Sequence, residues 1–170
     1  MKQELENPMR KISIEKVVLS CGATGPDLEK AKKLLAILTE RKIQTITSAK
    51  RIPDFNVRPG LEVGVRVTLR GEQGIKLLKT LLGALDGNLK TRSISDNHFS
   101  FGIAEYIDIP GVAYQREIGI RGLNITVDFI RAGVRVKRKK IRSGKLPKKQ
   151  HISKEEIIKF MESEFQTKFI

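Results

Sequence analysis

Side chains that commonly carry catalysis are few in this sequence, and their spacing does not build a site. His98 and His151 stand far apart, with no other metal-ligating residues at matched spacing near them. Asp54 and Asp96 fall in expected loops, without a second carboxylate to tune either one. The run RGEQGIK at 70–76 lacks the spacing of a phosphate-binding loop. We therefore expect no catalytic residue, no metal and no cofactor, and interpret the protein as a non-enzyme.

The abundant chemistry is cationic. The 170 residues include 33 lysines and arginines against 19 acids, a net charge of +14, and the isoelectric point is near 10.1. Such an excess implies a polyanionic partner, either a nucleic acid or an acidic membrane surface. Aromatic residues make up 5% of the chain and tryptophan is absent. This composition favours contacts with phosphates, sugars and RNA shape over base stacking.

Cysteine usage and hydropathy indicate an intracellular protein. The single Cys21 cannot form an internal disulfide or a zinc site, and it fits a small core residue. No apolar run approaches the roughly 20 residues of a membrane span. The first residues, MKQELENPMRK, lack the apolar core of a signal peptide. We expect no membrane partner and no small-molecule substrate.

The stretch 61–70 gives the clearest structural signal. Apolar and polar residues alternate without a break, which is typical of a half-buried strand. Its polar side carries Arg66, Thr68 and Arg70. The loop before it, KRIPDFNVRPG at 50–60, contains two prolines and ends in glycine, so we expect an extended excursion between strands. A basic loop beside an arginine-bearing strand predicts a surface that reads nucleic acid.

Other periodic segments supply the elements that must position this strand. The first strand-like run loses its apolar phase near Lys16, which predicts a bulge or a strand buried on both sides. Helical spacing begins near Pro26 and again near Glu72. The order β-α-β-β-α-β-β predicts an α+β fold, a mostly antiparallel sheet of about five strands with helices on one face and the other face open for RNA. The strand-like runs besides 61–70 are 12–21, 43–47, 99–109 and 123–129.

The open face would carry short, hydrogen-bonding side chains and a net positive charge. Such a surface can lie against the shallow minor groove of an A-form helix, where 2′-hydroxyls and phosphates are accessible. The alternative is a solvated outer face, which antiparallel sheets commonly have. The net charge favours RNA. The residues expected on this face are Arg66, Thr68, Arg70, Ser100, Gly102, Asn124 and Thr126.

The segment 131–149 contains ten lysines and arginines and no acid, and Gly144 and Pro147 argue against a helix. We expect it to lie extended along RNA phosphates; a nuclear-import signal or a solvated tail is the alternative. Its candidate RNA-binding residues are Arg135, Lys137, Arg138, Lys139 and Lys140.

The C-terminal residues predict a docked helix. Ser153 and Glu156 form a capping-box pattern, and Ile157, Met161 and Phe165 follow as an apolar stripe. We expect two parts in one domain: 1–130 as an α+β RNA-binding core, and 131–170 as a basic extension and a helix packed on that core.

Several motifs together resemble one family. They are NPMRKISIEKVVLSCGA (7–23), TSAKR (47–51), FNVRPG (55–60), GVRVTLRG (64–71), FSFGIAEYIDIPG (99–111) and RGLNITV (121–127). In this order and spacing they resemble the universal large-subunit ribosomal protein numbered five, the 5S-rRNA-binding protein. The extension after Arg131 resembles its archaeal branch. Ser20 departs from this pattern, because the family usually has an asparagine there.

The resemblance implies a structural role on the cytoplasmic ribosome. The protein would be a monomer within the ribosome, anchoring 5S rRNA in the central protuberance and contacting the large-subunit rRNA. It would also reach P-site tRNA through loop 48–62 and help to bridge to small-subunit ribosomal protein thirteen. Matched motif positions place Asn7, Met9, Arg10, Lys16, Thr47, Lys50, Arg66, Thr68 and Asn124 near RNA, and Arg51, Phe55, Asn56, Val57 and Arg58 on the tRNA side.

Two other classes of function are kept as alternatives. A nucleotide- or phosphate-processing enzyme could bind a phosphate through Arg66 and Arg70, but it would need a general base or metal cluster beside them. A protein of anionic membranes would need a basic amphipathic helix, whereas the charge here lies in strands, loops and an extended segment.

Overall fold

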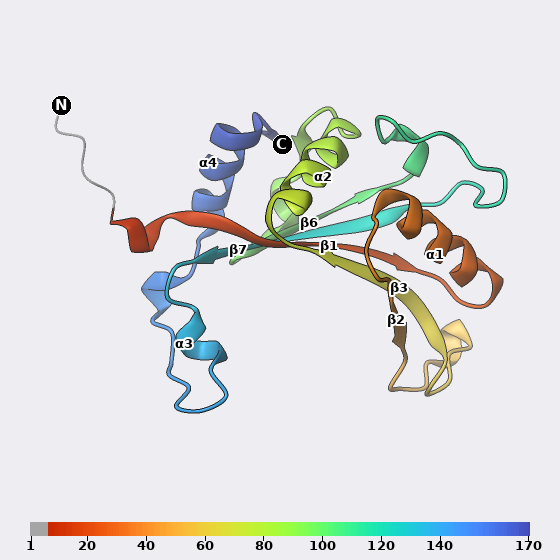
Figure 1. Cartoon of the computed structure of the whole chain (residues 1–170), viewed down its shortest axis with the longest axis horizontal. Coiled ribbons are helices and arrows are strands. Elements are labelled where there is room, and N and C mark those ends of the chain that lie inside the picture. Colours follow the sequence, from red (N-terminus) through yellow and green to blue (C-terminus); the bar gives the residue numbers. More distant parts are fainter. Residues whose placement is uncertain (1–6) are drawn as a thin grey trace.

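A computed structural model describes residues 7–170 and confirms the α+β fold (Figure 1). None of the helices in that part of the chain is long and apolar enough to cross a bilayer. The helices are α1 (Pro26–Leu38), α2 (Gly71–Gly83), α3 (Arg135–Arg138) and α4 (Lys154–Phe165). The strands are β1 (Ile12–Gly22), β2 (Gln44–Thr47), β3 (Glu62–Leu69), β4 (Asn88–Leu89), β5 (Ile94–Ser95), β6 (His98–Ile103), β7 (Leu123–Arg131) and β8 (Lys168–Phe169).

The main sheet has six strands in the order β2-β3-β1-β7-β6-β5, and every neighbouring pair is antiparallel. Of the two alternatives predicted near Lys16, the structure shows the bulge, because the register of β1 against β7 shifts between Ile14 and Lys16. One extra residue, Glu15, is thereby left out of the pairing with β7, as in other bulges. The bulge restores the alternation that places Val17, Leu19 and Cys21 on the core side.

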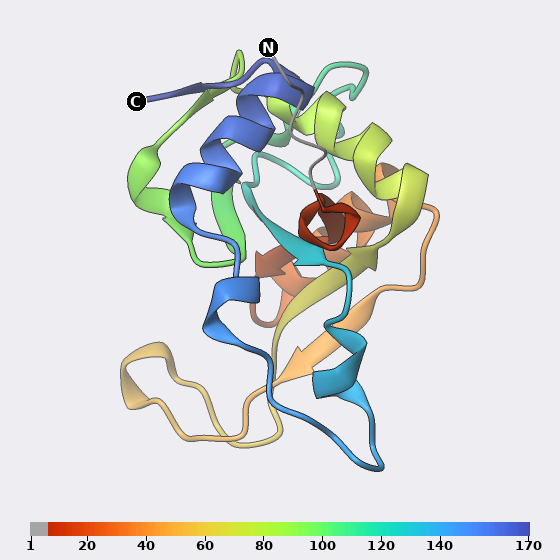
Figure 2. The ribbon, with the colours of Figure 1, turned by 90° about the vertical axis from the view of Figure 1, so that its left-hand side faces the viewer.

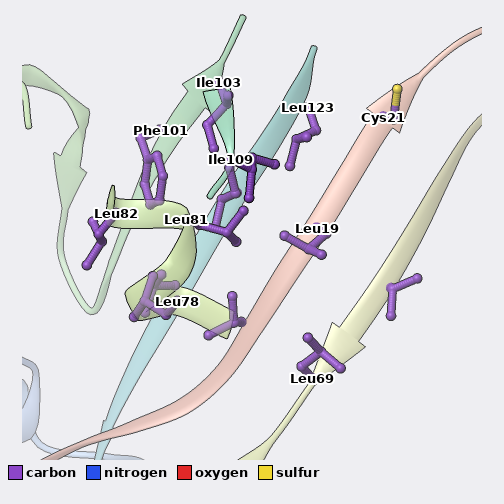
Figure 3. Packing of buried hydrophobic residues seen from close by; sticks show 14 of the residues in the cluster. Leu19, Cys21, Leu69, Leu78, Leu81, Leu82, Phe101, Ile103, Ile109 and Leu123 are labelled. Atoms are coloured by element: carbon purple, nitrogen blue, oxygen red, sulfur yellow. The ribbon is translucent and has the colours of Figure 1, made fainter. Parts of the chain in front are cut away.

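Helices α1, α2 and α4 lie on one side of this sheet (Figures 1 and 2). Leucines of α2 point onto the strands, where Leu78 and Leu81 meet Leu19 of β1 in a fully buried cluster (Figure 3). Burying each such side chain stabilises the fold by about 1.5–3 kcal/mol before entropy costs. On this covered side the ring of Phe99 stacks on the rings of Phe101 and Phe129, with centroid distances of 5.7 and 5.8 Å.

The C-terminal helix begins as predicted. The Ser153 hydroxyl accepts from the Glu156 N–H, and the Glu156 carboxylate accepts from the Ser153 N–H, which completes the capping box. Ile157 and Met161 are fully buried in the core. After α4, strand β8 pairs with β4 in a small parallel sheet. These contacts tie residues 154–170 to the core.

Three details differ from the expectations. The sheet has six strands because the short β5 extends its edge. The strand expected over 99–109 ends at Ile103, and the chain turns into a 3₁₀ segment at Tyr106–Asp108 that buries Tyr106. The basic segment is not wholly extended, because Arg135–Arg138 form one helical turn before Gly144 and Pro147 are reached.

Candidate nucleic-acid interface

The side of the sheet opposite α1, α2 and α4, called here the free face, presents its side chains in rows across the strands. The central row reads Gln44, Arg66, Ser20, Asn124, Gly102, because these residues are paired in register across five strands. None of the five is buried. A second row holds Thr68, Val18, Thr126 and Ser100, and a third holds Lys16, Asp128 and His98.

The central row is polar and its arginine is held in place. The Arg66 Nε donates to Gln44 Oε1 at 3.0 Å, and the Ser20 hydroxyl donates to the Asn124 carbonyl at 3.4 Å. No ion pair within residues 7–170 involves Arg66 or Arg70. A positioned cation without a carboxylate partner suits binding of a phosphate or sugar oxygen.

The third row is neutralised internally. Lys16 forms an ion pair with Asp128 across the strands at 2.9 Å, and both side chains are about three-tenths exposed, at 31% and 28%. His98 lies beside Asp128 on β6. Any RNA contact of Lys16 must therefore compete with an existing partner.

The loop between β2 and β3 projects beyond the free face (Figures 1 and 2). Main-chain bonds brace it: Ser48 and Leu61 are joined at its base, and Ile52 and Val57 bond each other in both directions at 2.9 and 3.0 Å. At its tip Phe55 is 75% exposed, whereas Val57 is buried at 6%. Of the expected tRNA-side residues, Val57 therefore shapes the loop instead of presenting its side chain. Thr47, Lys50, Arg51, Asn56 and Arg58 are exposed.

The basic extension is folded onto the end of the sheet. Arg131 is 4% exposed, donates to Glu156 Oε1 at 2.6 Å and to the His151 carbonyl at 3.2 Å, and so faces protein, not solvent. Arg138 forms a bidentate ion pair with Glu15, in which Nη1 donates to Oε1 at 2.5 Å and Nη2 donates to Oε2 at 2.6 Å. The expectation that 131–149 lies extended along RNA is therefore wrong for Arg131, an internal anchor. Arg135, Lys137, Lys139 and Lys140 are exposed.

Ionisation follows these contacts. Hydrogen bonding to Arg138 lowers the pKa of Glu15 against a smaller opposing effect of burial. Burial works to raise the pKa of Glu156, but the Ser153 N–H and Arg131 outweigh it, so that pKa is also lowered. Burial raises the pKa of the Cys21 thiol, which donates to the Gly122 carbonyl at 3.3 Å. This cysteine is thus a core residue with little thiolate character.

The N-terminal candidates are not on the free face. Asn7 caps a short 3₁₀ helix, Pro8–Arg10, by accepting from the Met9 N–H at 3.0 Å. Asn7 and Arg10 line an open groove of about 1030 Å³, whose opposite wall includes Lys159 and Phe160 of α4. Gln150 joins this helix to the extension, because its amide donates to the Met9 and Ala132 carbonyls at 3.1 and 2.9 Å.

Two residues of the central row were not predicted. Ser20 was identified only as a departure from a family pattern, although the alternation of Val17, Leu19 and Cys21 would have placed it on the free face. Gln44 starts a short strand whose register depends on the loop geometry, and the register against β3 shifts between Ile46 and Thr47. The free face does bring together Arg66, Thr68, Ser100 and Asn124; Arg70 follows β3 as the residue before α2.

These features define a class: a basic α+β protein whose sheet is covered by its own helices on one side and bare, polar and cationic on the other. The model of the ribosomal L5P family C-terminus matches residues 62–160. The chain is 44% identical over 169 residues to the large ribosomal subunit protein uL5 of Nanoarchaeum equitans, covering 98% of this chain and 100% of that protein.

Other archaeal relatives agree. Identity is 41% over 161 residues to large ribosomal subunit protein uL5 of Archaeoglobus fulgidus, with 93% and 90% of the two chains covered. It is 42% over 175 residues to the same protein of Picrophilus torridus, with 100% and 99% covered. The chain belongs to the uL5 family of large-subunit ribosomal proteins. Membership indicates a structural role in the ribosome.

Proposed function

We propose that this chain anchors 5S rRNA in the large ribosomal subunit by laying its free face against the RNA. The observation that carries the proposal is the central row from Gln44 to Gly102, which no segment of residues 7–170 buries. Helices supply the second layer on the other face, so the RNA would act as the missing layer here. Contacts by Arg66 to phosphate and by Ser20 and Asn124 to ribose hydroxyls fit the accessible groups of an A-form minor groove.

Two basic projections border the free face and support the same partner. The loop 48–61 stands at one end, and α3 with the segment after it stands at the other (Figure 1). Lys50 of the first projection and the exposed cations of the second would flank an RNA seated between them, where contacts with phosphates supply a large share of the affinity. The stacked Phe99, Phe101 and Phe129 lie on the covered side, so these rings are not available to an RNA on the free face.

The remaining partners are proposed for other surfaces. Phe55, Arg51 and Arg58 of loop 48–61 would reach P-site tRNA, and the Asn7 and Arg10 end would contact large-subunit rRNA. For small-subunit ribosomal protein thirteen we propose the loop 104–122. It exposes Tyr114 and Ile120 at 55% and 67%, away from the free face. The alternative, a phosphate-processing enzyme, lacks support on this face, where Asp128 is already paired with Lys16.

The proposal is tested by replacing Arg66 and Thr68 together with alanine. Both side chains point away from the core, so the melting temperature should stay within about 2 °C. The affinity for 5S rRNA should fall about tenfold, and the salt slope should fall by about 0.7–0.9 for the lost phosphate contact. The measurement is equilibrium binding to 5S rRNA from low to moderate salt.

A matched control removes the same chemistry from the covered side. Lys79 and Thr80 of α2 likewise supply one cation and one hydroxyl. The double alanine variant at these positions should bind 5S rRNA normally. Unchanged binding by the Arg66 and Thr68 variant would refute the assignment of the free face. Equal affinity of the unmodified chain for unrelated RNAs of the same length would refute specific recognition.

The tRNA loop is tested separately. Deleting Asp54–Val57 would also remove the buried Val57 and the bond pair that shapes the loop, so Phe55→Ala is the cleaner change. We expect 5S rRNA affinity within about twofold of the unmodified chain, because Phe55 lies off the free face. We expect slower peptide synthesis by ribosomes carrying the variant. Lost 5S binding with normal synthesis would reverse this division of roles.

A further inference from the structure

Both projections beside the free face end in an exposed apolar side chain. Phe55 is 75% exposed at the tip of loop 48–61, and Ile141 is 77% exposed in the extension. Each is followed by a non-glycine residue in the left-handed region, Asn56 and Arg142, both at φ 53°. Asparagine adopts this conformation readily, but an arginine there costs free energy that surrounding structure must offset. The turn directly after Ile141 is thus formed at a conformational cost.

The extension carrying Ile141 is a built loop. The Gly144 N–H donates to the Val136 carbonyl at 3.1 Å and closes the segment 136–144. A Cβ at Gly144 would lie 2.7 Å from Val136 Cγ1, so the two ends of this segment pass close to each other. Below the tip, Arg138 is fixed to Glu15 by two hydrogen bonds. The position of Ile141 is therefore set by the fold.

The surroundings of Ile141 indicate the chemistry of its partner. The neighbouring Lys139, Lys140, Arg142 and Lys145 are exposed, and the segment has no acid. A partner must therefore be anionic and must also offer an apolar surface to an isoleucine. RNA has both, because ribose rings and base faces lie next to its phosphates. Apolar side chains inserted beside bases are a known mode of nucleic-acid binding.

We propose that Ile141 is an apolar contact for ribosomal RNA, packing against a ribose or base face while the flanking cations hold the phosphates. The inference rests on the proposed RNA-binding function and adds a contact that charge alone does not supply. It assigns the exposed tip of the extension a role different from the electrostatic role of its lysines. The RNA is 5S rRNA or the adjoining large-subunit rRNA, and the experiment separates the two.

The test compares Ile141→Ala with Ile141→Lys in the full chain, measured against 5S rRNA and, separately, against large-subunit rRNA over a range of salt. Ile141→Ala should weaken binding to one of these RNAs about tenfold, from the apolar area lost. Its salt slope should not change, because no phosphate contact is removed. Ile141→Lys should also weaken binding at about 0.3 M salt, where the added charge is largely screened.

Ile37 provides matched controls, since it is 44% exposed on α1, on the helix-covered side of the sheet; Ile37→Ala and Ile37→Lys should bind as the unmodified chain does. If Ile141→Lys binds more tightly with a steeper salt slope, the tip is purely electrostatic and the inference is overturned. Unchanged binding of Ile141→Ala to both RNAs overturns it as well, and binding of the tip to anionic vesicles instead would assign it to membranes. Failure of the unmodified chain to bind either RNA would instead refute the proposed function.

A second measurement locates the contact directly. Cys21 is buried, so a cysteine introduced by Ile141→Cys is the accessible thiol among residues 7–170 and can carry a hydroxyl-radical source. We expect cleavage of the bound RNA at one short stretch of nucleotides. Diffuse cleavage along the whole RNA would contradict a fixed contact.

Discussion

The two faces of the sheet are made by the same strands, because successive residues along a strand point to opposite faces. In β1, Leu19 is fully buried under α2, whereas its neighbour Ser20 lies in the central row of the free face. In β3, Val65 and Val67 are buried on either side of the exposed Arg66. The comparison shows how the sheet divides its work: one set of side chains holds the protein together, and the other is left for a partner.

The largest difference between the two faces is expected in the stability of variants at Leu19 and Ser20. Replacing Leu19 with alanine should lower the free energy of unfolding by about 3–5 kcal/mol, because a fully buried side chain is removed and a cavity remains. Replacing Ser20 with alanine should change it by no more than about 0.5 kcal/mol. Urea denaturation followed by circular dichroism measures both.

RNA binding should show the opposite order at these two positions. Under conditions where both variants are folded, Ser20→Ala should weaken 5S rRNA binding more than Leu19→Ala does, since Ser20 is the one that faces the proposed partner. A stability loss at Ser20 as large as that at Leu19 would mean that the free face is a structural surface, and the comparison between the faces would fail.

Much of this division could be predicted from local sequence. Alternation over 61–70 identified the two sides of β3, and Ser153 with Glu156 identified the start of α4. The lost phase near Lys16 indicated the bulge as one of two alternatives. Each of these signals depends on residues a few positions apart. They were sufficient to predict that one face stays open and most of the side chains on it, but not Ser20 or Gln44.

Long-range pairing could not be predicted in the same way. Arg131 reads as one more cation in a basic run, yet it is buried because Glu156, twenty-five residues later, is brought against it. The pairing of β4 with β8 joins residues 88–89 to residues 168–169, and neither dipeptide has a strand signal of its own. In both cases the outcome depends on where α4 docks, which spacing along the chain does not specify.

The smallest expected effect concerns how the extension is held beside the free face. Glu15, placed outside the β1–β7 pairing by the bulge, binds Arg138, and this bond lowers the pKa of Glu15 from its ordinary value of 4.5. A carboxylate whose pKa is lower in the folded than in the unfolded chain stabilises the fold at pH values above the unfolded-chain pKa. That contribution is lost as the pH falls below 4.5 and through the lowered pKa. Because Arg138 is 54% exposed, the pair is worth about 1 kcal/mol or less.

We therefore expect the extension to loosen locally in acid while the sheet stays folded. Carbon-13 NMR of the Glu15 carboxyl should give a titration midpoint below 4.5, and the Arg138 Nε–H signal should shift in the same range. The Glu156 pKa is lowered too, so the unmodified chain mixes two titrations, and Glu15→Gln isolates the first. In that variant the Arg138 signal should resemble its acid form at neutral pH, because the carboxylate that fixes it is absent. An Arg138 signal that still shifts near pH 4 in Glu15→Gln would show that a carboxylate other than Glu15 controls the extension, and that Glu15 does not hold it at the border of the free face.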